Sequence, residues 1–267
     1  MVKLIASDLD GTLLHPGSGD LAPRTIELIK QLTQKGIRFV AASGRQYHSM
    51  EYMFRELKDE VSFVAENGSL LIDHDQVLFR GNIHPDLAHR ILTELKSQDS
   101  FSIALSREEG IYIENGNSEF AEHLRNEVHN KVIETENLLD ITEGVLKIAI
   151  CSSLDGTHIV DKYQKHLRDI FGNEINVVTS GNIWIDFIAP NTNKAVALSK
   201  LLDHLHIDPR DCIAFGDQYN DVEMLQFVGH SYAMSTAAPG ISYYSTYVTN
   251  CVDEVLQDIL DELDIES

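Results

Sequence analysis

The sequence predicts an α/β protein with a Rossmann-like core, built on a parallel sheet, and a second, α+β domain inserted into that core. Strand and helix patterns alternate at the beginning of the chain and again from about residue 190 to the end, as in parallel sheets joined by right-handed crossovers. In between, neighbouring strand patterns separated by short turns indicate an antiparallel sheet. We therefore expect the core to comprise residues 1–81 and 190–267, and the inserted domain residues 82–189.

The core begins with an apolar strand that ends at about Ser7. Pro23 suits the first turn of the following helix, and Gly36 suits its end. Apolar residues at helical spacing lie between these two positions. The elements expected after this helix are strands at 37–42 and 62–65, a helix at about 46–57 between them, and a hairpin at 69–72 and 77–79.

The inserted domain is expected to contain helices and strands in irregular order. Two strand patterns are separated only by Ser180-Gly181-Asn182, which indicates a hairpin. The expected helices are 86–96, 119–128 and 156–171, and the expected strands are 101–105, 110–113, 145–151, 175–179 and 183–188.

Pro190-Asn191-Thr192-Asn193 marks the expected return to the core, where strands and helices alternate again. This part should add two strands to the parallel sheet. The expected elements are a helix at 194–205, a strand at 211–215, a short helix at 222–227, a strand at 230–234 and an amphipathic helix at 252–263.

Composition excludes several classes of partner. The 42 acidic and 21 basic side chains give the 267 residues a formal charge of −21, which argues against nucleic acid and anionic membranes. Residues 228–252 carry no Asp, Glu, Lys or Arg, but their hydroxyl residues and Pro239-Gly240 exclude a membrane span. Cys151, Cys212 and Cys251 share no metal-binding spacing and indicate a reducing compartment. We expect a cytoplasmic protein, and the oligomeric state stays open.

Acidic residues follow two predicted core strands. Asp8 and Asp10 come after the first, and Asp217 and Asp221 come after the strand at 211–215. The carboxyl ends of parallel strands converge on one crevice, where two carboxylates about 4 Å apart repel by roughly 4 kcal/mol. Asp8 and Asp10 alone could form a metal site or share a proton, but four carboxylates need a cation. Oxygen ligands favour Mg²⁺.

The second strand ends in Ser43-Gly44-Arg45, which offers a hydroxyl, a backbone amide and a guanidinium. This combination suits an anion, although it is also compatible with an ordinary helix cap. Lys194 is expected on the opposite side of the crevice. Glu66-Asn67-Gly68 is compatible with a bare turn, and no chemistry is assigned to it.

Together, these motifs resemble those of the haloacid dehalogenase (HAD) superfamily. Their order and spacing are similar to those of its Cof-type (subfamily IIB) phosphatases, whose cap domain, of C2B type, is inserted between the second and third motifs. The similarity covers almost the whole chain. The matching motifs are Asp8-Leu9-Asp10-Gly11-Thr12, Ser43-Gly44-Arg45, Glu66-Asn67-Gly68, Lys194 and Gly216-Asp217-Gln218-Tyr219-Asn220-Asp221.

The resemblance implies a role for each motif. Asp8 would attack phosphorus and form an aspartyl-phosphate, and Asp10 would act as general acid and base. Mg²⁺ would be held by Asp8, the Asp10 carbonyl and Asp217. The phosphoryl oxygens would be held by Ser43, Lys194, Asn220 and the amides of Leu9 and Gly44. Thr12, Arg45 and Asp221 would support these groups, with Asp221 orienting Lys194 or a metal-bound water.

The function implied is Mg²⁺-dependent hydrolysis of a small phosphorylated metabolite, such as a sugar phosphate or a similar phosphomonoester. Two alternatives use the same crevice. A phosphomutase would transfer the phosphoryl group to a second hydroxyl, and a sensor would bind phosphorylated metabolites without turnover. Asp8 and Asp10 are both present, which argues against the sensor.

Overall fold

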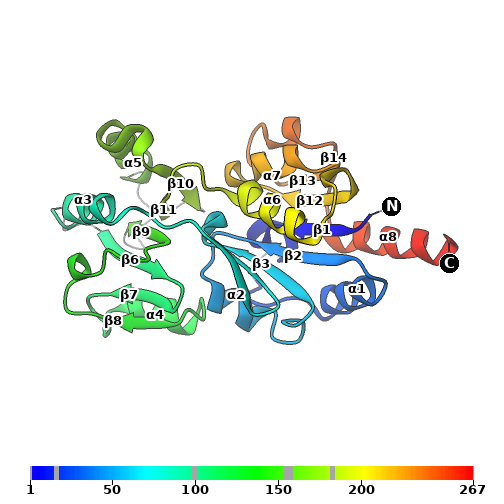
Figure 1. The fold of residues 1–267 in the computed structure, drawn as a ribbon, viewed down its shortest axis with the longest axis horizontal. Coiled ribbons are helices and arrows are strands. Elements are labelled where there is room, and N and C mark those ends of the chain that lie inside the picture. The colour runs from blue at the N-terminus through cyan, green and yellow to red at the C-terminus, as the bar shows by residue number, and fades with distance from the viewer. Residues whose placement is uncertain (1, 15–17, 98–100, 153–158, 181–183, 267) are drawn as a thin grey trace. The chain divides into compact units, whose positions relative to one another are not determined.

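The computed structural model describes residues 2–14, 18–97, 101–152, 159–180 and 184–266 (Figure 1). Its contacts divide the chain into two compact units. The first comprises Met1–Ser43, Met50–Phe79 and Asn193–Ser267. The second comprises Gly44–Ser49 and Arg80–Thr192.

The first unit contains an eight-stranded sheet in the order β14-β13-β12-β1-β2-β3-β4-β5. Strands β14 through β3 are parallel to their neighbours, and β4 runs antiparallel to β3. The parallel sheet therefore brings the carboxyl ends of β1, β2, β3 and β12 to one edge. The strands are β1 Leu4–Ser7, β2 Arg38–Ala42, β3 Val61–Ala65, β4 Leu70–Asp73, β5 Gln76–Arg80, β12 Cys212–Gly216, β13 His230–Met234 and β14 Tyr247–Thr249.

Helices cover this sheet and make β1 fully buried. Leu198 and Leu201 of α6 pack in one cluster with Leu4 and Val40 of the sheet. Ile5 alternates to the opposite face and is also buried. The helices are α1 Pro23–Gln34, α2 Tyr47–Met53, α6 Lys194–Leu205, α7 Val222–Phe227 and α8 Val252–Glu266, with short turns η1 Leu9–Leu13, η2 Glu66–Gly68, η5 Pro209–Asp211, η6 Tyr219–Asp221 and η7 Ile241–Tyr244.

The second unit contains a six-stranded sheet in the order β10-β11-β9-β6-β7-β8. All its neighbours are antiparallel except β7 and β8. Helices α3 and α5 pack with Ile148 and Phe187, and α4 packs with Ala104 and Ala149. The elements are α3 Pro85–Lys96, β6 Phe101–Arg107, β7 Gly110–Ile113, α4 Glu119–Asn126, β8 Val132–Glu134, η3 Leu138–Asp140, β9 Lys147–Ser152, α5 Ile159–Phe171, η4 Gly172–Glu174, β10 Asn176–Ser180 and β11 Trp184–Ile188.

The predicted fold class is confirmed: a parallel α/β core carries an inserted α+β cap. The antiparallel pairing of β10 with β11 confirms the predicted hairpin, whose turn at 181–183 lies outside the described residues. The predicted domain limits stay a prediction. The contacts divide the chain after Phe79 and before Asn193, and they group Gly44–Ser49 with the second unit.

The sequence prediction missed two short strands, β8 and β14, and made α2 about four residues too long. Both strands have three residues, which is too short for an alternation of apolar and polar side chains to be recognised. Within the ranges that the structure describes, no helix is long and apolar enough to cross a membrane.

Candidate active site

Asp8 lies at the carboxyl end of β1, between β2 and β12. Its amide donates to the carbonyl of Phe215 in β12 at 3.0 Å, so the first acidic turn is attached to the strand that carries the second. The chain then enters η1 at Leu9. The Asp8 side chain is buried, as expected for a residue at the edge of a sheet that helices cover on both faces.

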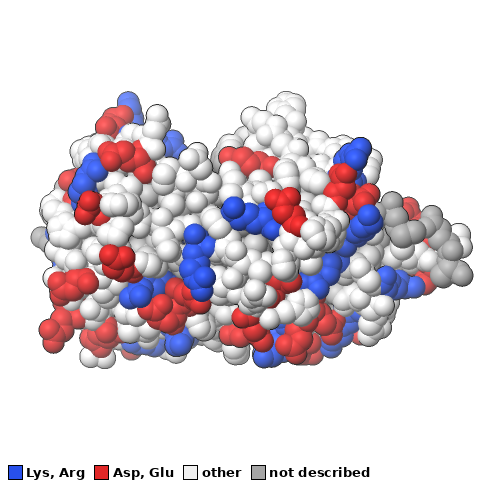
Figure 2. Space-filling view, viewed as in Figure 1, with Lys and Arg blue, Asp and Glu red and all other residues white. Residues whose placement is uncertain are grey.

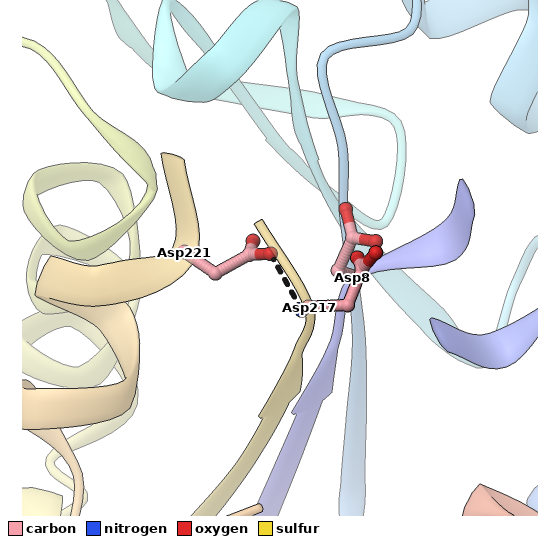
Figure 3. Close-up of side chains that lie close together, drawn as sticks. All are labelled: Asp8, Asp217 and Asp221. Atoms are coloured by element: carbon pink, nitrogen blue, oxygen red, sulfur yellow. Dashed lines mark hydrogen bonds between the residues drawn. The ribbon is translucent and has the colours of Figure 1, made fainter. Parts of the chain in front are cut away.

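Asp217 and Asp221 follow β12. The short turn η6 brings the Asp221 carboxylate back over the strand end, where its Oδ2 accepts the amides of Asp217 and Gln218, both at 3.0 Å. Gly216 makes this possible, because a Cβ there would lie 2.6 Å from the Asp221 Cβ. Figure 3 shows Asp217 next to Asp8 at the ends of neighbouring strands, with Asp221 on the segment that follows β12 and pointing toward them.

The turn after Asp8 also contacts Asp217. Thr12 Oγ1 donates to Asp217 Oδ1 at 3.1 Å, and Gln218 Nε2 donates to Asp217 Oδ2 at 3.2 Å. Gly11 has a φ of +87°, and a Cβ on it would lie 2.5 Å from Asp217 Oδ2. Glycine at this position therefore meets two requirements, a left-handed backbone and a close approach to a carboxylate.

A pair of glycine substitutions separates these two requirements. Gly36 has the same φ of +87°, but a Cβ added there would have no atom within 4 Å. Gly36→Ala is expected to lower the free energy of unfolding by about 1 to 2 kcal/mol, the cost of the backbone conformation. Gly11→Ala should lose about 1 to 3 kcal/mol more, because it also displaces Asp217. Equal losses in urea titrations of the two variants would show that the close approach is unimportant.

Lys194 is the cation of the site. It begins α6, whose N-cap Asn193 accepts the amide of Val196 at 2.8 Å. Its Nζ donates to Asp8 Oδ1 and to Asp221 Oδ1, each at 2.6 Å. Lys194 and Asp221 are fully buried. The side chain thus joins the ends of β1 and β12 to the first turn of a helix.

The local charge is unbalanced. The group holds three buried carboxylates and one ammonium, that of Lys194, which contacts Asp8 and Asp221, so the formal charge is −2 (three minus one). Burial raises the pKa of Asp8 well above its usual range, an effect that Lys194 opposes and the neighbouring carboxylates increase. Burial and the Asp221 charge likewise raise the pKa of Asp217. Burial acts to lower the pKa of Lys194, but Asp221 and Asp8 outweigh it and keep the ammonium charged.

These residues fit a divalent cation. Asp8, Asp217 and Asp221 each offer an oxygen, and these oxygens lie within 4.8 Å of one another. No other three acidic, histidine or cysteine side chains among the described residues could hold a metal ion in this way. An all-oxygen set favours a hard ion such as Mg²⁺ over zinc. The side chain of Asp10 is exposed and lies outside the group, which favours a metal site over a dyad of Asp8 and Asp10.

The turn η2 contributes more than the sequence suggested. Asn67 Oδ1 accepts Asn220 Nδ2 at 3.0 Å. A Cβ on Gly68, whose φ is +95°, would lie 2.2 Å from the Asn193 carbonyl oxygen. Asn67 therefore orients a predicted phosphate ligand, and Gly68 lets η2 pack against the start of α6. The signal that could have found them is an Asn-Gly pair one residue after a buried strand.

The remaining predicted residues lie as follows. Ser43 is buried at the end of β2, where its amide donates to Val64 and its carbonyl accepts the amide of Asn67 at 3.0 Å. Leu9 is fully buried in η1. Gly44 and Arg45 belong by their contacts to the second unit, in which the Gly44 carbonyl accepts Lys147 Nζ at 2.7 Å. The structure thus brings together Asp8, Thr12, Lys194, Asp217 and Asp221.

Comparisons with known proteins agree with this fold and site. A family model described as haloacid dehalogenase-like hydrolase matches residues 5–257. The chain is 28% identical over 265 residues to the 5-amino-6-(5-phospho-D-ribitylamino)uracil phosphatase YbjI of Escherichia coli (strain K12), a match that covers 96% of this chain and 97% of that protein. It is 30% identical over 242 residues to an HMP-PP phosphatase of Enterobacter sp. (strain 638), covering 90% of this chain and 86% of the relative.

A solved structure extends the agreement to three dimensions. The crystal structure of a haloacid dehalogenase-like hydrolase from Bacteroides thetaiotaomicron superposes with a TM-score of 0.84 at 27% identity. The match covers 97% of this chain and all of the other. Core and cap are therefore both present in this solved relative.

Proposed function

Because the chain belongs to the haloacid dehalogenase-like hydrolases, we propose that it is a Mg²⁺-dependent phosphatase that hydrolyses a small phosphorylated metabolite through an aspartyl-phosphate on Asp8. The observation that carries the proposal is the contact of the buried Asp8 with Lys194, beside Asp217 and Asp221. The resemblance to Cof-type phosphatases predicted from the motifs is confirmed by the family match and by relatives named as phosphatases.

Asp8 is the proposed nucleophile. Its carboxylate attacks phosphorus, and the bond to the leaving oxygen breaks as that oxygen takes a proton from Asp10. In the second step Asp10 removes a proton from water, which attacks phosphorus and releases phosphate from Asp8. The division of labour is supported by burial, since Asp8 is buried beside Lys194 whereas the Asp10 side chain is exposed and can exchange protons with solvent.

The transferring phosphoryl group is proposed to be held by Lys194, the Ser43 hydroxyl, Asn220 and the amides of Leu9 and Gly44. The ammonium of Lys194 already lies 2.6 Å from Asp8 Oδ1, so it can compensate charge that develops on the nucleophile and on phosphate. Asn67 orients Asn220 through its hydrogen bond. Positioning and charge compensation supply most of the acceleration in phosphoryl transfer.

Asp8, the Asp10 carbonyl and Asp217 are proposed to hold Mg²⁺, which, when bound, would neutralise the nucleophile and the substrate phosphate together. The chain prepares this set of ligands without the metal. Thr12 and Gln218 hold the two oxygens of Asp217, and Asp221 holds Lys194 and the backbone of η6. Two of the proposed ligands are therefore held by neighbouring side chains, Asp217 by Thr12 and Gln218 and Asp8 by Lys194, as is common in metal sites.

The substrate class follows from charge and from the relatives. Both curated relatives carry names of phosphatases that act on small phosphorylated compounds. A chain of net charge −21 repels polyanions, so the anion must be small enough to be neutralised by local cations. We propose a phosphomonoester of the size of a sugar phosphate.

Release of inorganic phosphate from a panel of phosphomonoesters, with and without Mg²⁺, tests the proposal. Turnover of at least one ester that stops with EDTA and returns with Mg²⁺ is expected. Phosphate appearing on a second hydroxyl of the substrate, with none released, would instead indicate a phosphomutase. Binding without turnover on the whole panel would indicate a sensor and contradict the hydrolase.

Removal of Mg²⁺ should have a pH-dependent effect on stability. The folded-state pKa values of Asp8 and Asp217 are raised, so without metal these groups stabilise the fold at low pH and lose that contribution as pH rises through the raised values. A cation replaces the protons, so Mg²⁺ should raise the melting temperature more at pH 8 than at pH 5. Thermal unfolding with Mg²⁺ or EDTA measures this, and an equal shift at both pH values would contradict it.

A further inference from the structure

Lys147 is a buried lysine of the second unit that the proposed mechanism does not use. Charged side chains cover much of the face drawn in Figure 2, where acidic and basic groups lie close together in contact with solvent. Among the residues that the structure describes, only two lysines are buried: Lys194 of the site, which is 1% exposed, and Lys147, which is 8% exposed. A buried ammonium group needs polar partners, so the contacts of Lys147 indicate what it does.

Lys147 contacts a carboxylate and a backbone carbonyl. Its Nζ lies 3.7 Å from Asp186 Oδ2 in β11, and it donates to the Gly44 carbonyl oxygen at 2.7 Å. Asp186 is 1% exposed. A buried ion pair commonly stabilises a protein no more than apolar residues of similar volume would. Stability alone therefore gives no reason for a charge here, and the short contact with Gly44 is the feature to be explained.

The sheet of the second unit sets the direction of the Lys147 side chain. Strand β9 lies between β11 and β6 and is paired with both. Asp186 is directly opposite Ala149, so Lys147, two residues before Ala149, points to the same face of the sheet as Asp186. Ile148 points to the other face, where it packs in one cluster with α3 and α5. The lysine cannot turn away without a change in strand pairing.

Gly44 lies between two anchored peptide groups. The Ser43 carbonyl accepts the amide of Asn67 at 3.0 Å, and the Gly44 carbonyl accepts Lys147 Nζ. Because a glycine has more backbone freedom than any other residue, these two hydrogen bonds set the course of the chain through Gly44. The bond from Lys147 fixes the planar peptide group that joins Gly44 to Arg45. It thereby sets where Arg45 lies relative to the Gly44 amide.

We propose that Lys147 is a positioning residue for the phosphoryl group. By holding the Gly44 carbonyl, it keeps the hydroxyl, amide and guanidinium of the turn at residues 43–45 at the spacing that binds phosphate. This proposal rests on the phosphate site of the proposed function. Lys147 acts through the Gly44 peptide and does not contact substrate. Since the turn holds the phosphoryl group in the substrate and in the transition state alike, loss of Lys147 should weaken binding more than it slows turnover.

A double variant, Lys147→Met with Asp186→Asn, tests the proposal. It removes both charges at similar side-chain volume, so that no buried charge is left unpaired and the fold should survive. In isothermal titration calorimetry with Mg²⁺, the dissociation constant of inorganic phosphate is expected to rise about 10- to 100-fold, the effect of losing a hydrogen bond that involves a charged group. The KM of the best ester should rise by a similar factor, and kcat should stay nearly unchanged.

Ser49→Ala is the matched control. Ser49 Oγ donates to the Val128 carbonyl at 2.5 Å, a further bond that ties residues 44–49 to the rest of the second unit. The variant removes this bond and leaves the Gly44 carbonyl in place. Its affinity for phosphate should stay within about a factor of two of the wild type, as for most substitutions outside a site. Melting temperatures establish that both variants are folded.

Unchanged phosphate affinity in the folded double variant would overturn the proposal. An equal loss of affinity in Ser49→Ala would also overturn it, because attachment of residues 44–49 to the second unit would then explain the effect. If the wild type binds no phosphate, the proposal fails together with the proposed phosphate site. Phosphate binding without turnover of any ester would contradict the hydrolase alone, so the two failures can be told apart.

Discussion

Asp8→Asn is expected to lower phosphate release by about 10⁴-fold or more, the range found when an enzyme loses its nucleophile. The amide that replaces the carboxylate is a poor nucleophile toward phosphorus. The substitution also removes a proposed metal ligand. The fold should survive, because the change removes one of three buried carboxylates that repel one another and so relieves the unbalanced charge. Initial rates on the best ester of the panel, with saturating Mg²⁺, measure the effect.

Asp264→Asn provides the control for this variant. Asp264 is an exposed aspartate of α8, paired with Lys35, so the same chemical change there should leave turnover within about a factor of two, as for most surface substitutions. Retention of one tenth or more of the activity by Asp8→Asn would exclude an aspartyl-phosphate at this residue. If Asp8→Asn is inactive, a free energy of unfolding at least as large as that of the wild type would show that the activity is lost through the missing carboxylate and not through unfolding.

Lys194→Met is expected to destabilise the protein by about 3 to 5 kcal/mol without metal, the range for breaking a buried ion pair. Methionine has a similar length, but it leaves Asp8, Asp217 and Asp221 buried without a cation. The loss should be smaller at pH 5 than at pH 8, because protonation can then neutralise the raised-pKa carboxylates Asp8 and Asp217. Mg²⁺ should restore part of the stability. Urea titrations at both pH values, with and without Mg²⁺, provide the measurement.

The control for Lys194→Met is Lys200→Met in the same helix. The Lys200 ammonium lies 4.7 Å from the ring centroid of Phe79, a contact worth about 0.5 to 1 kcal/mol at an exposed site. The stability lost in Lys200→Met should not depend on Mg²⁺. If Lys194→Met were no more destabilising than Lys200→Met, the three carboxylates would have to be neutralised in another way, and the proposed role of Lys194 would fail.

The sequence predicted most of the fold because its signals are local. A strand that ends in Asp8, a helix from Pro23 to Gly36 and a strand at 211–215 each follow from residues that are neighbours in the chain. The two strands that the prediction missed lack such local signals. Strands β8 and β14 are too short to show a period, and β14 is recognised as a strand only from its pairing with β13.

The sequence likewise predicted some residues of the candidate site and missed the contacts of others. The acidic turns, Ser43 and Lys194 were found as motifs, since each follows or begins an element with a clear pattern. Asn67 and Gly68 are compatible with a bare turn when only the sequence is considered, because their partners, Asn220 and Asn193, are remote in sequence. The sequence also gives no sign that Gly11 lies close to Asp217. The backbone conformation of a turn is by itself a sufficient reason for a glycine at that position.

The order of motifs in the sequence was enough to predict a parallel α/β core with an inserted cap and to identify the turns that carry acidic residues. These features can be predicted because strands, helices and turns depend on residues that are close in the chain. Only the tertiary structure decided which charges meet. Lys194 contacts Asp8 across 186 positions and Asp221 across 27, and Thr12 contacts Asp217 across 205. Such contacts depend on how helices and strands pack in three dimensions, and no local pattern contains that information. For the same reason, only the tertiary structure showed that the Asp221 carboxylate contacts Lys194 and lies beside those of Asp8 and Asp217.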